Sequence, residues 1–201
     1  MALNFANDNS LSAITTKPSG LSGGALNLIS TQTASSSSTI SFTSGIDDTY
    51  DSYVFKFIDI HPATDSVRFS FQTSTNGGSS YGVTATTTNF QVVHNEADTS
   101  TDFSYKGNQD LAQSTSFQVF GNTQGNADDE SACGELHLYN PSSTTFVKHF
   151  MAVQQQSAEN DGSRQHFTAG YFNTTLAVDA VQFKFDSGNI DSGVIKLYGV
   201  S

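Results

Sequence analysis

Five histidines, nineteen acidic residues and one cysteine are the side chains that could do chemistry in this chain. His137 and His149 lie on either side of a predicted hairpin turn, and in some registers of that hairpin they would face each other and could share a metal ion. No third ligand is identifiable, whereas protein zinc sites use three or four ligands from the chain. The sequence therefore predicts no metal site, no cofactor site and no catalytic residue.

Acidic residues gather in the segment Gly45–Asp51, where Asp47, Asp48 and Asp51 could bind calcium. The spacing lacks the alternating ligands and the distal glutamate of a calcium-binding loop, so a solvated turn is the preferred interpretation. A carboxylate pair for glycoside hydrolysis depends on a separation in space and stays open as a hypothesis. The motifs of serine hydrolases, P-loop enzymes, zinc proteases and dinucleotide-binding proteins are absent from the sequence.

Cys133 is the only cysteine, so the chain cannot form an intrachain disulfide or a thiolate metal site, and a small buried or idle thiol is expected. The formal net charge is −11, and lysine and arginine form no cluster. Nucleic acids and anionic membrane surfaces reward clustered cations, so neither is an expected partner. The first ten residues lack the basic start and apolar centre of a signal peptide, which predicts synthesis in a cytoplasm without export.

The elements that must position these residues are β-strands. In the segment Tyr53–Ile60, one face is aromatic and the other is largely apolar, which predicts a strand buried on both sides. In the segment Val67–Gln72, apolar and polar residues alternate with the period of two that is typical of a half-buried strand. We expect a core that contains Phe55, Phe57, Phe69, Phe71, Phe117, Val119, Phe183 and Phe185.

About ten or eleven such segments follow one another without a sustained helical period, so the fold class is predicted to be all-β. They include the short segment Asp102–Tyr105, the alternating segment Thr115–Phe120 and the segment Gln165–Asn173. We expect an antiparallel β-sandwich that is jelly-roll-like. Glu135–Tyr139 and Thr145–Phe150 read as a hairpin, and Ala180–Phe185 is expected to pair with Val194–Val200 through the turn between them. Ser74–Tyr81 resembles the Asp-box of sialidases, with Asn76 at the position of the aspartate; one degenerate copy predicts a turn and no chemistry.

The chain divides into an N-terminal arm, residues 1–25, and a β-sandwich domain, residues 26–201. The arm contains four residues, Pro18, Gly20, Gly23 and Gly24, that disfavour regular structure. A disordered tail is one interpretation. Scattered apolar residues favour the other, an arm that makes assembly contacts on a neighbouring subunit, because a solvated tail has little use for such side chains: Leu3, Phe5, Leu11, Ile14 and Leu21.

Several segments together resemble a group of virion structural proteins of marine tailed phages, especially those of cyanophages. These segments are FANDNSLSAIT, HPATD, HNEAD, DLAQSTSFQ, NPSSTTFVKHF, AGYFNTT and SGNIDSGVIKLYGV, and the likeness covers nearly the whole chain. The resemblance implies a component of a virion, with no catalytic residues to carry over. It does not distinguish a head decoration protein, a fibre or a tail protein.

The first hypothesis is therefore a non-enzymatic bacteriophage virion structural protein, most simply a head decoration or fibre-like subunit. It would contact other virion proteins of the capsid or tail surface and form a homo-oligomer, with a trimer expected by analogy. The alternative is a tail adhesin that binds host-surface glycans through exposed rings of Tyr50, Tyr81 and Tyr105. A small glycan-degrading enzyme is the third hypothesis.

Overall fold

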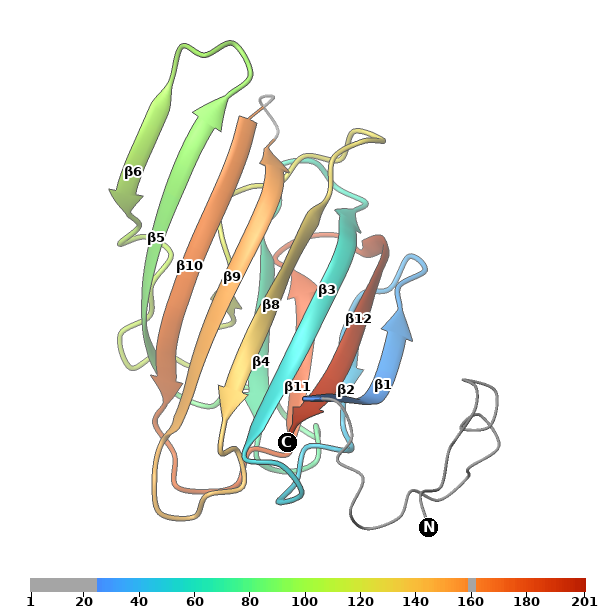
Figure 1. Ribbon diagram of the computed structural model, residues 1–201, viewed down its shortest axis with the longest axis vertical. Coiled ribbons are helices and arrows are strands. Elements are labelled where there is room, and N and C mark those ends of the chain that lie inside the picture. Colours follow the sequence, from blue (N-terminus) through green and yellow to red (C-terminus); the bar gives the residue numbers. More distant parts are fainter. Residues whose placement is uncertain (1–24, 159–161) are drawn as a thin grey trace, which may run out of the picture.

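Two antiparallel sheets make up the part of the chain that the computed structural model describes, residues 25–158 and 162–201 (Figure 1). The eight-stranded sheet has the order β1 (Leu26–Thr33), β12 (Ile190–Val200), β3 (Ser52–Pro62), β8 (Ala132–Tyr139), β9 (Lys148–Ala158), β10 (Gly162–Phe172), β5 (Ala85–Asn95) and β6 (Thr101–Tyr105). The four-stranded sheet has the order β2 (Ile40–Phe42), β11 (Ala180–Phe185), β4 (Phe69–Ser74) and β7 (Gln118–Val119).

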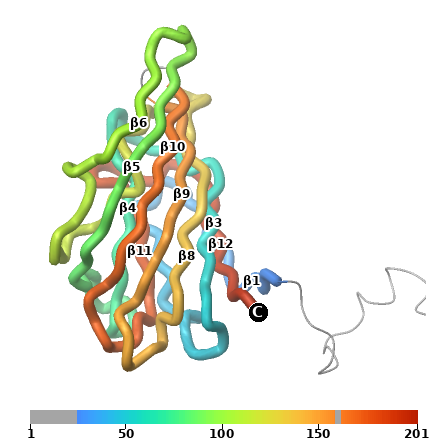
Figure 2. The backbone as a smooth tube through the Cα atoms, turned by 60° about the vertical axis from the view of Figure 1, so that its left-hand side comes forward, coloured from blue at the N-terminus to red at the C-terminus, as the bar shows by residue number. Residues whose placement is uncertain are grey.

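The sheets pack face to face, so the predicted all-β sandwich is confirmed (Figure 2). The jelly-roll refinement is not confirmed, because the strands divide into eight and four, whereas a jelly roll is built from eight strands in two Greek keys. Within the described ranges, no helix is long and apolar enough to cross a membrane. The predicted arm lies outside the described residues except for Ala25.

Phenylalanine rings fill the space between the sheets. Six of the eight predicted core residues are buried, each at most 2% exposed: Phe55, Phe57, Phe69, Phe71, Phe183 and Phe185. Phe69 lies near the middle of this cluster, with its ring centroid 5.3 Å from that of Phe120 and 5.9 Å from that of Phe183. Period-two alternation in β3, β4 and β11 carries these rings to the inner faces of both sheets.

Phe117 and Val119 correct the predicted core, because both are only half-buried. Their neighbours Gln118 and Phe120 point inward instead, each 1% exposed. Gln118 accepts a hydrogen bond from Thr87 Oγ1 at 2.6 Å. The alternation of this strand was therefore correct in period but wrong by one residue in phase, because a buried glutamine occupies a position at which sequence reasoning expects an apolar side chain.

β3 is also less buried than predicted, because only part of its second face is covered. Val54 is 2% exposed, but Ile58 on the same face is 40% exposed. Asp59 has a φ of 51°, and the pairing of β3 with β8 shifts register between Phe57 and Ile60. This irregularity returns Ile60 to the inner face, where it is fully buried.

The sequence predicts two pairs of neighbouring strands, and the structure contains one of them. β8 and β9 pair antiparallel, which confirms the predicted hairpin. β11 and β12 do not pair: β11 lies between β2 and β4, whereas β12 lies between β1 and β3 in the other sheet. The predicted final pair is therefore wrong, since the segment that joins the two strands crosses from one sheet to the other.

The Asp-box-like segment forms the predicted turn after β4. Asn76 Oδ1 accepts hydrogen bonds from Ser74 Oγ at 2.8 Å and from the Ser80 backbone N–H at 3.1 Å. Gly77 and Gly78 have φ values of 70° and 80°, which glycine adopts without strain. Asn76 therefore supplies the turn-closing acceptor, and this segment has a structural role.

Candidate functional site

The outer face of the eight-stranded sheet is the most prominent surface of the described chain. The four-stranded sheet packs against the opposite face only (Figures 1 and 2). Because side chains alternate along a strand, every second residue of the eight strands points outward. Two groups of aromatic residues stand out on this outer face.

The first group, which we call the outer aromatic patch, spans β10, β5 and β6. Phe167 is paired with Phe90, and their rings stack at a centroid distance of 4.8 Å. The ring centroid of Phe103 lies 5.6 Å from that of Phe90, and Phe103 is 72% exposed. Val92 is 40% exposed and Tyr105 is 59% exposed. The patch consists of Phe90, Val92, Phe103, Tyr105 and Phe167.

The second group surrounds a hollow of about 400 Å³ near the other end of the same face, which we call the outer hollow. Tyr171 and His149 are paired across β10 and β9, with ring centroids 6.2 Å apart. Tyr139 also lines the hollow, and its hydroxyl contacts Met151 Sδ at 3.9 Å. Thr86 and Thr88 lie among the other lining residues, none of which is Asp, Glu, Lys or Arg.

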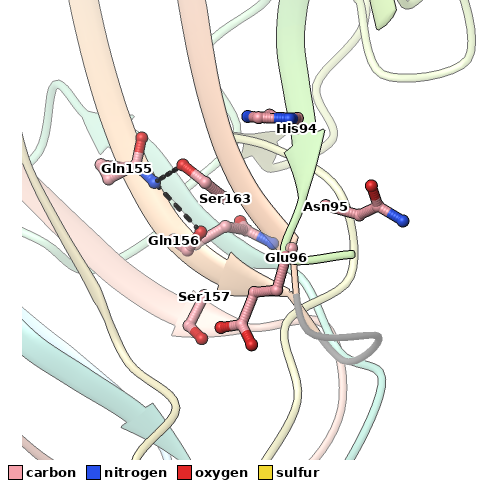
Figure 3. Close-up of a pocket in the computed structure, with 8 residues that line it drawn as sticks. His94, Asn95, Glu96, Gln155, Gln156, Ser157 and Ser163 are labelled. Carbon is pink, nitrogen blue, oxygen red and sulfur yellow. Dashed lines mark hydrogen bonds between the residues drawn. The ribbon is translucent and has the colours of Figure 1, made fainter. Parts of the chain in front are cut away.

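A third, polar hollow of about 410 Å³ lies where β5 and β9 end and β10 begins (Figure 3). Gln155 Nε2 donates to Ser163 Oγ at 2.9 Å and to the Gln156 carbonyl oxygen at 3.3 Å, which ties β9 to β10. The segment between Ala158 and Gly162 lies outside the described residues. The hollow therefore carries no functional argument.

The two histidines considered for a metal site do not face each other. His137 is paired with Met151, so His149 is displaced from it along β9. His137 Nε2 instead lies 2.9 Å from Glu135 Oε1. Within residues 25–158 and 162–201, no group of three or more His, Cys, Asp or Glu residues is placed to hold a metal ion.

The acidic loop that could bind calcium is organised as a turn. Asp47 Oδ1 accepts hydrogen bonds from the Thr49 backbone N–H at 2.9 Å and from the Tyr53 hydroxyl at 3.1 Å. The hydrogen bonds from Thr49 hold the pKa of Asp47 below its usual value. The carboxylate thus already serves the local backbone, in agreement with the preferred interpretation of a turn.

Cys133 lies at an exposed position, so of the two expected states, a buried or an idle thiol, the structure rules out the buried one. Its Sγ accepts a hydrogen bond from the Asp59 backbone N–H at 3.3 Å and donates to Asp59 Oδ1 at 3.4 Å. Partial burial raises the pKa of this thiol above its ordinary value. A raised pKa lowers the thiolate fraction, which makes Cys133 a weaker nucleophile than a free cysteine.

Only one of the three tyrosines predicted as stacking platforms presents an exposed ring. Tyr50 is half-buried and packs edge-on against Tyr53, while the Tyr81 hydroxyl is buried. Tyr105 is exposed, and its hydroxyl donates to Asp110. Sequence reasoning missed Tyr139 and Tyr171, although each lies in a predicted strand at an outward position.

Beneath the outer aromatic patch, the inner side of the sheet holds buried polar residues. Gln91, His166 and Gln154 form one row across β5, β10 and β9. The Asn122 backbone N–H donates to His166 Nε2 at 3.2 Å, so the neutral imidazole carries its proton on Nδ1. Burial, together with the positive charges of Arg164 and Lys106, lowers the pKa of His166 to about 4.

Comparisons with protein-family models, curated proteins and solved structures give no match for this chain.

Proposed function

We propose that this protein is a non-enzymatic structural subunit of a bacteriophage virion, a head decoration or fibre-like subunit that contacts neighbouring proteins through the outer face of its large sheet. The observation that carries the proposal is the outer aromatic patch. Phe103, Tyr105 and Val92 are all at least 40% exposed and adjoin the stacked pair Phe90 and Phe167. Exposed apolar residues gathered in one place are typical of protein interaction sites.

The assignment to a virion rests on the resemblance of the sequence segments to phage structural proteins. A rigid sandwich with a phenylalanine core suits such a role, because its outer face holds a constant shape for neighbouring subunits. The net charge of −11 keeps the particle surface soluble and disfavours contact with the packaged genome.

Removal of the N-terminal arm tests the assembly role. A chain that begins at Leu26 keeps β1 and every other described strand, so we expect it to fold with a melting temperature close to that of the full chain. It should be incorporated into phage particles far less than the full chain when both are supplied in trans. Equal incorporation of the two chains would show that residues 1–25 make no assembly contact.

A second candidate function, a tail adhesin for host glycans, is favoured by the outer hollow. Aromatic faces beside hydroxyl groups, without charged side chains, suit a neutral sugar, since its C–H groups pack on rings while its hydroxyls form hydrogen bonds. Tyr139, Tyr171 and His149 are the rings that such a ligand would contact.

Binding to an array of neutral oligosaccharides tests this candidate. We expect Tyr171→Ala to lower the retained signal at least about tenfold, the effect of losing roughly 1.4 kcal/mol of binding free energy. Tyr198→Ala is the matched control, because Tyr198 lies on the outer face of β12, outside the hollow. No binding by the unsubstituted protein, or equal losses in both variants, would reject the adhesin function.

A further inference from the structure

β6 is the free edge of the eight-stranded sheet beside the outer aromatic patch. It pairs with β5 on one side only, and no other described segment lies along its far side in Figure 1. The Asn95 N–H donates to the Ser100 carbonyl oxygen, and the Lys106 N–H donates to that of Asn89. Because hydrogen-bonded positions alternate in an antiparallel pair, the backbone groups of Thr101, Phe103 and Tyr105 point away from β5.

The other sheet edges are interrupted or very short, whereas β6 is continuous and has Asp102 as its one charged residue. β1 has a bulge between Leu28 and Ser30, which interrupts its edge. β2 and β7, at the edges of the smaller sheet, have only three and two residues. β6 has five residues, Thr101–Tyr105, with no lysine, proline or bulge, and its central Phe103 is 72% exposed. Such an edge is a template for pairing with another strand.

We propose that β6 pairs antiparallel with β6 of a second copy of this chain, about a two-fold axis at Phe103, and so joins two eight-stranded sheets. In this register Phe103 pairs with its own counterpart, and Thr101 pairs with Tyr105. The outward N–H and C=O groups of all three residues are then satisfied in both copies, as an isologous interface requires.

The side chains of β6 are complementary in the same register. Asp102 faces Ser104 of the second copy, and within one strand Ser104 Oγ already donates to Asp102 Oδ2 at 2.6 Å. A register centred on Asp102 would instead place two carboxylates opposite each other, which is destabilising. The register centred on Phe103 also brings the outer aromatic patches of both copies together, so that the exposed Phe103 rings cover each other.

This pairing holds between copies of the chain whether or not they belong to a virion, so its test does not depend on the proposed function. Cysteine cross-linking measures the pairing of β6 with β6 in the full chain, in which Cys133→Ser first removes the one native thiol. Directly opposite residues in a hydrogen-bonded pair have Cα atoms about 5.5 Å apart, which lies within the range that a disulfide spans. We expect Phe103→Cys to form a covalent dimer on mild oxidation.

Two further variants fix the register. Thr101→Cys and Tyr105→Cys, each carrying a tag of different size, should form a mixed dimer with each other and little dimer alone. Val92→Cys is the control, because Val92 is exposed on β5, one strand away from the edge. A monomeric Phe103→Cys chain, or equal cross-linking at Val92, would overturn the proposal.

Sizing with light scattering at physiological salt gives an independent measurement without cysteines. We expect the unsubstituted protein to form an assembly with an even number of copies. Phe103→Asp should halve that number, while its circular dichroism spectrum remains that of a β-strand protein. Phe146→Asp should leave the mass unchanged, since Phe146 is 68% exposed outside β6. The two-fold pairing differs from the trimer expected by analogy, so a trimer, or a monomeric unsubstituted chain, would contradict it.

Discussion

Replacing Phe69 with alanine should lower the free energy of unfolding by about 3–5 kcal/mol, the cost of a large cavity in a packed core. Phe69 is 1% exposed, and its ring lies between those of both sheets. The ring centroid of Phe57, on the large sheet, is 5.6 Å away, and that of Phe185, on the small sheet, is 5.3 Å away. Rigid sheets on both sides limit collapse of the cavity. Urea denaturation followed by circular dichroism measures the change.

Phe146→Ala is the matched control for Phe69→Ala, because it removes the same ring from a residue that is 68% exposed. Its unfolding free energy should change by no more than about 0.5 kcal/mol, as is usual for surface substitutions. A loss below about 1 kcal/mol for Phe69→Ala would contradict the packing described for the core.

Acid should destabilise the protein through the titration of His166. Burial lowers the pKa of His166 to about 4, whereas an unfolded histidine has a pKa of 6.5. Between these values the unfolded state binds more protons than the folded state, so stability is present above pH 6.5 and falls as the pH drops toward 4. From pH 7 to pH 5, His166 alone should lower the free energy of unfolding by about 2 kcal/mol.

Urea denaturation of the unsubstituted protein and of His166→Gln, at both pH values, tests the assignment. A glutamine oxygen can still accept the hydrogen bond from the Asn122 backbone N–H, but the side chain does not titrate. Between pH 7 and pH 5, we therefore expect the variant to lose about 2 kcal/mol less unfolding free energy than the unsubstituted protein. An equal loss in both proteins would show that His166 is not the group responsible.

Local alternation was enough to predict the sandwich and most of its core. Phe69 and Phe71 alternate with serine and glutamine, so the phenylalanine face of β4 is readable from period two alone. The prediction that this strand is only half-buried is wrong, because Ser70 and Gln72 on its polar face are each 1% exposed. Phe117 and Phe120 show where this reasoning stops. Both are aromatic, and which of the two is buried depends on Gln118. This residue points inward because it accepts a hydrogen bond from Thr87 on β5, in the other sheet.

Sheet membership could not be read from neighbouring strands. β11 and β12 follow each other in sequence but belong to different sheets, because the partners of β12 are β1 from the start of the domain and β3. Such pairing is set by contacts between segments far apart in the chain, for which a single sequence shows no local signal.

The candidate surfaces were predictable only as strand residues. Tyr139 and Tyr171 were expected on strands, but their meeting at the outer hollow depends on the order β8, β9, β10. Phe103 was likewise placed on a short strand, without any sign that this strand is a sheet edge. Sequence predicts which side chains share a face, whereas topology decides which of those faces is left uncovered.

The position and copy number of the protein in purified phage particles test the central claim most directly. Electron microscopy of particles that carry a C-terminally tagged copy, labelled with gold, should place the label at regular sites on the head or tail, and mass spectrometry should find a fixed copy number. Ser201 is exposed, so a tag there leaves the core intact. A label that is absent from purified particles, or scattered without fixed sites, would contradict the structural role.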